Sequence, residues 1–259
     1  MPVPVNPIKA ALSAGKRQMG LWIALAHPTS AEIASRAGFD FCLIDGEHGP
    51  NDIPLMLEQL RAIGNGTAAA AARIPVGDAR IVKQVLDLGI QTLVVPMVDT
   101  PEQAREMVRA TRYPPEGIRG VGAAMARASN YGEVTDMVTS ANAQICLFVQ
   151  CESARAVANI DAIASTPGVD GVFIGPADLS ADMGFPGNPG APEVRATIAH
   201  AFARIQAAGK AVGIIAFDEA LVREYVEMGA SFVAVGGDAS LLARAIRGAA
   251  SLAAELRGA

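Results

Sequence analysis

Short apolar runs alternate with amphipathic segments along nearly the whole chain, and this alternation constrains the fold more than any other feature. The runs are continuously apolar, which is typical of parallel strands that are covered on both faces. The segments between them repeat apolar residues at helical spacing, as in 53–63, 78–89 and 192–209. Strands are predicted at Leu21–Leu25, Phe41–Ile44, Ala69–Arg73, Thr92–Val95, Ile145–Gln150, Gly171–Ile174, Val212–Ile215 and Phe232–Val235.

Glycines support the same pattern, because four of them stand just before a predicted strand, where the residue after a helix end belongs. They are Gly38, Gly89, Gly209 and Gly229. Eight strands alternating with helices over 259 residues predict an α/β fold, a (β/α)8 TIM barrel forming a single domain, 1–259. A doubly wound sheet is the alternative. Two connections, roughly 112–142 and 175–191, are long, as functional or disordered loops are.

Composition narrows the class of protein. The net charge is −5 and no Lys/Arg run forms a polybasic patch, so no nucleic-acid partner is expected. No uncharged apolar run is long enough to cross a bilayer, and the N-terminus lacks the apolar stretch of a signal peptide, so no membrane partner is expected. Cys42 and Cys146 lie in predicted strands, where free thiols are usually buried, which fits a cytoplasmic location. Only 5% of residues are aromatic, so the core is expected to be Ala, Val, Ile and Leu.

Polar residues gather just after the predicted strands. In a barrel of this kind the active site lies at the carboxyl ends of the strands, so these residues are expected to meet there. No comparable cluster precedes the strands. The set comprises His27, Asp45, Glu47, His48, Arg73, Gln150, Glu152, residues 175–178 and residues 236–238.

Glu152 and Asp178 are the predicted metal ligands. They follow neighbouring strands, and carboxylate oxygens without a Cys/His cluster suit a hard divalent cation, Mg²⁺ or Mn²⁺, or Co²⁺. An equally good interpretation makes them structural. In that case Glu152 would cap a helix at 153–163 and Asp178 would cap the turn after it.

Arg73 follows a run of alanines that leaves room for a ligand, so its guanidinium is a candidate for binding an oxyanion. A salt bridge to a neighbouring helix is the alternative. His48 needs an orienting partner to act as a base, and Asp87 is the candidate because an acid near a helix C-terminus is disfavoured unless it is held. His27 either contacts substrate or orients the turn before Pro28.

Two kinds of chemistry lack a candidate. None of the four lysines, Lys9, Lys16, Lys83 and Lys210, falls at the carboxyl end of a predicted strand, so no Schiff-base lysine is expected. The chain also lacks the glycine-rich motifs that bind nucleotide phosphates.

Six motifs, taken in order, resemble the HpcH/HpaI aldolases, which are class II pyruvate aldolases of the 4-hydroxy-2-oxoheptanedioate and 2-dehydro-3-deoxyglucarate type. The resemblance spans about 20–242. The motifs are IDGEHGPND, AAARIP, QTLVVPMVDT, GIRGVG with ARASNYG, VQCES and IGPADLSADMG. It implies a barrel of the phosphoenolpyruvate/pyruvate type, in a homohexamer whose paired subunits exchange a C-terminal helix.

The resemblance also implies roles for individual residues. Glu152 and Asp178 would hold the metal, Arg73 would bind the keto or enolate oxygen, and His48 paired with Asp87 would be the acid/base. Asp45 would order water near the metal. Trp22 and Gln150 would line the substrate site, and the backbone of Gly175, Pro176, Ala177 and Asp178 would hold the substrate carboxylate. His27 and Cys151 depart from the family pattern and put the aldehyde specificity in doubt.

The implied reaction is the reversible cleavage of a 4-hydroxy-2-oxo acid to pyruvate, or hydroxypyruvate, and an aldehyde through a metal-bound enolate. Two alternatives stay open. One is another lyase of the same superfamily, such as a citryl-CoA-lyase-like subunit, although no basic groove for a CoA ester is evident. The other is a non-catalytic barrel that senses an oxo acid. The sequence leaves the role of Glu47 undecided between supporting the site and contacting another subunit.

Overall fold

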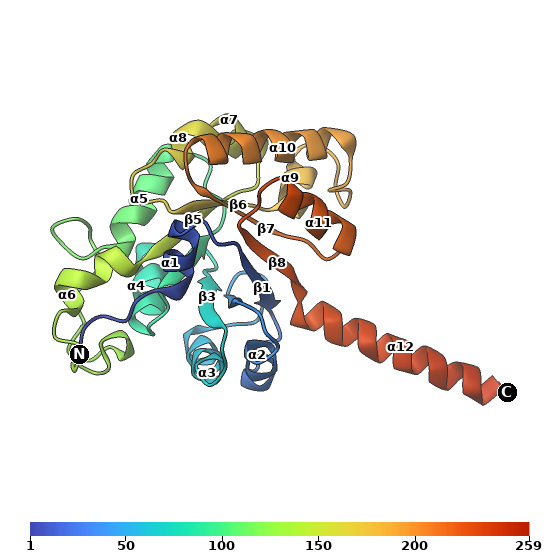
Figure 1. Ribbon diagram of the computed structural model, residues 1–259, viewed down its shortest axis with the longest axis horizontal. Coiled ribbons are helices and arrows are strands. Elements are labelled where there is room, and N and C mark those ends of the chain that lie inside the picture. The colour runs from blue at the N-terminus through green and yellow to red at the C-terminus, as the bar shows by residue number, and fades with distance from the viewer. Residues whose placement is uncertain (259) are drawn as a thin grey trace.

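Eight parallel strands close into a barrel in the computed structural model, which describes residues 1–258 (Figure 1). Each strand pairs with the next one in sequence, and β8 pairs with β1, so the barrel has no free edge. This confirms the predicted (β/α)8 barrel and rules out the open, doubly wound sheet. The strands are β1 Gln18–Ile23, β2 Phe41–Asp45, β3 Ala69–Arg73, β4 Thr92–Val95, β5 Cys146–Cys151, β6 Gly171–Ile174, β7 Ala211–Ile215 and β8 Phe232–Gly237.

The predicted strands agree with these bounds to within two residues, except that β1 begins three residues earlier than predicted. β1 ends at Ile23, before Ala26, whose left-handed backbone (φ 52°) an extended strand cannot continue through. The four glycines predicted to follow helices all have positive φ, between 69° and 102°. A residue after a helix C-terminus takes this conformation, and glycine does so without steric cost.

Helices surround the barrel and connect its strands. They are α1 Pro7–Ser13, α2 Pro28–Ser35, α3 Ile53–Ile63, α4 Ala79–Asp87, α5 Pro101–Thr111, α6 Met137–Ser140, α7 Ala154–Ala158, α8 Ile160–Ala164, α9 Pro176–Asp182, α10 Pro192–Ala207, α11 Glu219–Glu227 and α12 Asp238–Gly258, with 3-10 turns at 127–129 and 141–144. Most begin at a side-chain cap. Thr100 and Gln103, for example, form a capping box that satisfies two N–H groups at the start of α5.

The core has two layers of different composition. Aliphatic residues fill the space between strands and helices, as predicted. The barrel interior instead contains four of the eight phenylalanines, Phe41, Phe148, Phe173 and Phe232, so the prediction of a purely aliphatic core is wrong there. Phe232 stacks on Phe41 at a centroid distance of 4.0 Å and on Phe148 at 4.6 Å. A few large rings fill the barrel axis with little loss of side-chain entropy.

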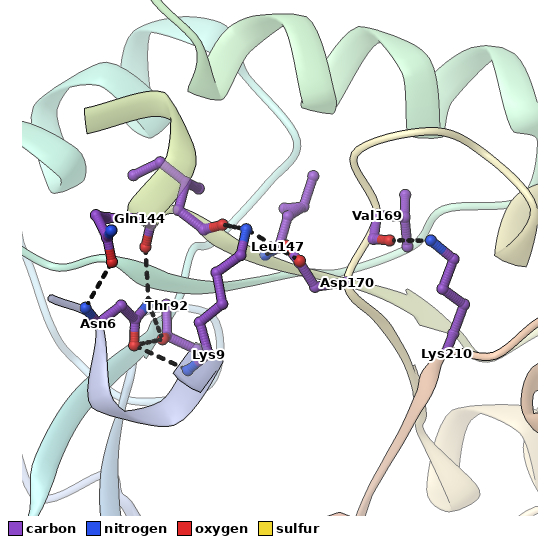
Figure 2. A network of polar contacts seen from close by, with 9 residues as sticks. Asn6, Lys9, Thr92, Gln144, Leu147, Val169, Asp170 and Lys210 are labelled. Carbon is purple, nitrogen blue, oxygen red and sulfur yellow. Dashed lines mark hydrogen bonds and ion pairs between the residues drawn. The ribbon is translucent and has the colours of Figure 1, made fainter. Parts of the chain in front are cut away.

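Polar contacts close the amino end of the barrel, where α1 covers the entrance (Figure 2). Lys9 Nζ donates to the carbonyl of Ile145 at 2.5 Å and lies 3.1 Å from the Asp170 carboxylate. Lys210 Nζ donates to the carbonyl of Val169 at 2.7 Å. Both lysines therefore satisfy carbonyl groups just before β5 and β6, which explains their position away from the carboxyl ends of the strands.

The two long connections differ in where they lie. The segment after α5 (112–145) runs beside the amino ends of the strands and contains ordered turns, so it is not a disordered loop. A functional role for this segment stays a prediction. The connection after β6 begins directly at the carboxyl end of the strand and forms α9.

The last helix, α12, projects from the barrel (Figure 1). Of its described residues only Asp238 is buried, and Leu241, Leu242, Ile246, Leu252 and Leu256 are exposed. Asp238 anchors the base of the helix, because its carboxylate accepts the N–H of Ala24 at 2.8 Å and the hydroxyl of Ser30 at 2.5 Å. Within residues 1–258, no helix combines the length and the hydropathy that crossing a membrane requires.

Candidate active site

Asp45 and Arg73 occupy the last positions of β2 and β3 and face each other in the strand register. Arg73 Nε lies 2.9 Å from Asp45 Oδ1, and Nη2 lies 2.7 Å from Oδ2, so the guanidinium donates two parallel hydrogen bonds. Nη1 lies 2.8 Å from the Glu47 carboxylate, and Cζ is 4.9 Å from the ring centroid of Trp22. Arg73 is thus held on every side, which neither sequence-based interpretation foresaw, since its partners come from the end of β2 and not from a helix.

Asp45 uses both carboxylate oxygens to hold the site together. Besides Arg73, it accepts the backbone N–H groups of Glu47 at 3.0 Å and His48 at 3.3 Å. Burial raises the pKa of Asp45, but the hydrogen bonds and charge of Arg73 outweigh burial and hold this pKa below its ordinary value. That Asp45 orders water near a metal stays a prediction. Its hydrogen bonds to Arg73 and to the turn that carries His48 are present in the structure.

Glu152 follows β5 and is almost fully buried. Its Oε1 accepts the backbone N–H of Met97 at 2.8 Å, and its Oε2 accepts the Gln150 amide. Burial raises the pKa of Glu152 to about 7, helped by the negative charges of Asp178 and Glu47 and opposed by those hydrogen bonds. Within residues 1–258 Glu152 forms no salt bridge, so a cation bound there would relieve the repulsion from Asp178 and Glu47.

Backbone strain accompanies this placement of Glu152. Met97, which donates to it, has a left-handed backbone (φ 56°) that is uncommon for a residue with a side chain. Gly175 lies against the same carboxylate, because a Cβ there would overlap Glu152 Oε2 and lie 2.9 Å from Gln150 Nε2. The carbonyl oxygen of the Gln150 side chain is buried without a hydrogen-bond partner among the described residues. The site is therefore built with polar atoms that lack a protein partner.

The structural interpretation fails for Glu152, and Asp178 meets it only in lying in the first turn of a helix. Ser153, not Glu152, caps α7, with its Oγ accepting the N–H of Ala156 at 2.9 Å, and no side chain caps α9. Asp178 is exposed in the first turn of α9. Residues 1–258 hold no cluster of three or more His, Cys, Asp or Glu suited to a metal ion. Two carboxylates fit Mg²⁺, which typically takes one or two and keeps several waters.

The predicted substrate residues lie at the same face, with one difference in role. Trp22 is buried against Arg73, and Ala177 and Asp178 present first-turn N–H groups that a helix cannot itself satisfy. His27 Nδ1 accepts the N–H of Thr29 at 3.1 Å and so caps α2, which agrees with a role in orienting the chain at Pro28. Contact of His27 with substrate stays a prediction. His48 is exposed on the turn after β2.

Asp87 does not pair with His48 within one chain, which corrects the simplest form of the predicted dyad. Asp87 ends α4 and precedes β4, so it lies at the amino ends of the strands, whereas His48 follows the carboxyl end of β2. A five-residue strand spans roughly 16 Å, so the barrel itself separates them. Asp87 instead accepts a hydrogen bond from Arg119 at 2.8 Å. The number of residues between His48 and Asp87 does not indicate this separation. The order of elements does, because one residue follows a strand and the other precedes one.

Sequence reasoning missed two features of the site. It left Glu47 without a role, although Glu47 contacts Arg73 directly. Burial raises the pKa of Glu47, while the charges of Arg73 and His48 lower it and those of Asp45 and Asp178 raise it. It also assigned no role to Arg119, although Arg119 lies in the GIRGVG motif.

Known proteins resemble the chain throughout its length. A hydroxypyruvate/pyruvate aldolase of Pseudomonas aeruginosa is 54% identical over 247 residues, covering 95% of this chain and 92% of the relative. A 4-hydroxy-2-oxo-heptane-1,7-dioate aldolase of Salmonella dublin is 53% identical, covering 96% and 94%. The crystal structure of an HpcH/HpaI aldolase/citrate lyase family protein from Burkholderia cenocepacia J2315 superimposes with a TM-score of 0.93 at 41% identity, covering 98% and 100%.

The family match covers all eight strands of the barrel. The pattern described as HpcH/HpaI aldolase/citrate lyase matches residues 18–245, from the start of β1 into α12. It includes Asp45, Arg73 and Glu152 and therefore the whole polar face described above. The chain belongs to the HpcH/HpaI aldolase/citrate lyase family.

Proposed function

We propose that this protein is a divalent-cation-dependent aldolase that reversibly cleaves 4-hydroxy-2-oxo acids to pyruvate, or hydroxypyruvate, and an aldehyde. Family membership makes it a carbon–carbon lyase, since the relatives named above are aldolases. The observation that carries the finer proposal is the arrangement around Arg73. A rigidly held guanidinium lies at the same face as Glu152, whose pKa is raised to about 7 by burial and by the charges of neighbouring carboxylates.

Glu152 and Asp178 would hold the cation, Mg²⁺, Mn²⁺ or Co²⁺. When bound, such an ion would act as a Lewis acid that polarises the keto group of the 2-oxo acid. The first-turn N–H groups of Ala177 and Asp178 are suited to the substrate carboxylate, because they are donors without a helical acceptor. Gln150, whose amide carbonyl has no partner in the described chain, lies beside Glu152.

Arg73 would stabilise the negative charge that develops on the keto oxygen when the substrate forms an enolate. Two of its nitrogens are committed to Asp45, so Nη1, which now contacts Glu47, is the donor that a substrate oxygen would take over. Because Asp45 and Trp22 hold the guanidinium in place, it does not need to reorganise when charge appears, which is the basis of electrostatic catalysis.

His48 would move the proton at C3 of the nucleophile. Since the barrel separates His48 from Asp87 in one chain, the proposed dyad can form only between two chains. Three exposed apolar residues near Asp87 in the 112–145 segment, Ile118, Val121 and Met125, favour a subunit contact there. Loss of His48 would slow proton exchange by about 10²–10⁴-fold.

The projecting helix α12 supports an oligomer. An apolar groove of about 700 Å³ lies between α2 and the base of α12, and its lining includes Leu21, Leu25, Ile33, Phe39 and Leu242. A single chain leaves both this groove and the apolar residues of α12 exposed. We therefore expect paired subunits to exchange their C-terminal helices within a homohexamer, each helix filling the groove of its partner.

A direct test is pyruvate release from a panel of 4-hydroxy-2-oxo acids by the purified, cation-loaded protein. At least one member of the panel should be cleaved, a chelator should abolish cleavage, and Mg²⁺, Mn²⁺ or Co²⁺ should restore it. Borohydride with pyruvate should not inactivate the protein, because no lysine lies at the catalytic face. Cleavage of no member would favour an oxo-acid-binding barrel, and full activity after stripping would contradict cation dependence.

A further inference from the structure

Arg119 is a buried cation in the segment that follows α5. Its side chain is 1% exposed, and Nη2 donates to Asp87 Oδ1 at 2.8 Å. Its guanidinium lies over the ring of Tyr113, with Cζ 4.4 Å from the ring centroid. The backbone N–H of Arg119 is fixed too, through a hydrogen bond of 2.9 Å to the carbonyl of Arg112. Neighbours thus hold this side chain from several sides.

The charge of Asp87 can be solvated without a buried cation beside it. The Asp87 side chain is 27% exposed, so water can solvate its charge, whereas burying a guanidinium carries a desolvation cost that the ion pair must offset. Arg119 Nε and the Tyr113 hydroxyl are also buried without a hydrogen-bond partner among the described residues. A weaker contact with an exposed cation would serve a purely structural carboxylate equally well. The geometry suggests that the orientation of Asp87 matters.

The ion pair leaves Asp87 with one fixed oxygen and one available oxygen. Arg119 takes Oδ1, and Oδ2 faces Gly122, where a Cβ would lie 3.6 Å from it. The available oxygen therefore points in a defined direction, in the same segment as the exposed side chains of Val121 and Met125.

We infer that Arg119 is a positioning residue for the reaction: it holds Asp87 Oδ1 so that Oδ2 meets the imidazole of His48 on a second copy of the chain. This inference rests on the proposed function, because it needs His48 to move a proton and Asp87 to act between chains. Arg119 itself touches no substrate. It acts through the direction that it gives to one carboxylate.

The test follows exchange of the pyruvate methyl protons with D₂O by NMR, using cation-loaded protein without an aldehyde. We expect Arg119→Gln to slow exchange about tenfold, part of the 10²–10⁴-fold that a positioned acid/base contributes. In an Asp87→Asn background the same substitution should have no further effect, because the two residues act as a unit. Pyruvate and cation affinities should stay unchanged. Arg119→Lys, which keeps one donor to Oδ1, should recover part of the rate.

Arg127→Gln is the matched control. Arg127 belongs to the same segment and holds the same helix end, but it binds a backbone carbonyl and not the Asp87 carboxylate. It should lower the melting temperature about as much as Arg119→Gln while leaving exchange near the wild-type rate. Equal slowing by both substitutions would mean that local destabilisation, not positioning, slows the reaction, and would overturn the inference.

Mixed oligomers give a second test that is independent of folding. Co-expressed His48→Ala and Asp87→Asn chains should recover exchange, because one chain then supplies His48 and the other Asp87. Adding Arg119→Gln to the His48→Ala chain, which carries the working Asp87, should lower the recovered rate about tenfold. The same substitution on the Asp87→Asn chain should retain it.

The two failures are distinguishable. No exchange by the wild-type protein would overturn the proposed function and the inference with it. Exchange by the wild type that Asp87→Asn leaves unchanged, or equal loss of recovery from Arg119→Gln on either chain, would overturn the inference alone.

Discussion

Arg73 and Glu152 have opposite electrostatic situations at one face of the barrel. Arg73 is neutralised by Asp45 and Glu47 at distances of 2.7 to 2.9 Å, whereas burial and neighbouring carboxylates raise the pKa of Glu152 to about 7. A fixed donor beside an uncompensated carboxylate is the arrangement expected where substrate and cation bind together.

Arg73→Lys should reduce aldol cleavage by roughly two to three orders of magnitude, the size of effect seen when a preorganised donor is removed. Lysine keeps the charge but cannot donate two parallel hydrogen bonds to Asp45 and a third to a substrate oxygen. Steady-state kinetics with cation-loaded protein would measure this as a loss in kcat. Near-normal kcat would mean that Arg73 only holds Asp45 and Glu47 in place.

Glu152 makes the stability of the cation-free protein depend on pH. The folded protein keeps the Glu152 proton up to about pH 7, whereas the unfolded chain loses it near the ordinary pKa of 4.5. The folded state therefore binds more protons, and the stabilisation that is complete below pH 4.5 is lost as the pH rises through 7. The loss should be roughly 3 kcal/mol.

Urea unfolding of wild type and Glu152→Gln in a chelator would measure this. Glutamine does not titrate, so the difference between the two free energies of unfolding isolates Glu152. The difference between the two free energies of unfolding should change between about pH 4.5 and pH 7, and a saturating divalent cation should suppress this change. A pH-independent difference would show that Glu152 is not held protonated in the folded protein.

The junction of β6 and α9 shows how one element position controls the site. The strand ends at Ile174, and α9 begins at Pro176, so Gly175 alone turns the chain beside Glu152. The family resemblance assigned Gly175 to the substrate site. The structure adds a steric reason for a glycine, because a Cβ would collide with Glu152 and Gln150 at the end of β5.

Gly175→Ala should weaken cation binding at least tenfold, because the added methyl group overlaps Glu152 Oε2 and displaces the carboxylate. Titration calorimetry with Mn²⁺ would measure the affinity. Gly64→Ala is the control, since a Cβ there meets its neighbours at an ordinary 3.5 Å and should leave cation binding unchanged. Unchanged affinity in Gly175→Ala would place the cation away from Glu152.

At the scale of the molecule, a single chain leaves apolar surface uncovered both on α12 and on the barrel. The helix exposes an apolar stripe, while the groove between α2 and its base is also apolar. Both surfaces would be buried if subunits exchanged the helix, and Asp238 would fix the direction in which the helix leaves the barrel.

Leu242→Glu with Ile246→Glu should convert the oligomer to smaller species and lower activity, because charges would replace the exposed apolar side chains of α12. Size-exclusion chromatography with light scattering would report the mass. Arg244→Gln with Arg247→Gln changes the same helix without touching the stripe and should leave the mass unchanged. An unchanged mass in the first variant would contradict helix exchange.

The sequence by itself determined the barrel. Eight apolar runs, helices of the right period and glycines at the helix ends all agree, and such local signals survive without knowledge of the partners. It also determined which polar residues reach the catalytic face, because every parallel strand delivers its last residue to the same end. Strand ends at Asp45, Arg73 and Gly175 were therefore readable from the order of the elements.

Only the tertiary structure decided how those residues are used. Whether Arg73 pairs with Asp45, whether Glu152 caps a helix, and whether Asp87 lies near His48 depend on the register between strands and on side-chain contacts across the barrel. The phenylalanines of the barrel interior were unexpected for the same reason, since composition gives no information about which layer a ring fills. Local sequence sets where a strand ends, but packing sets the partner of the group at its end.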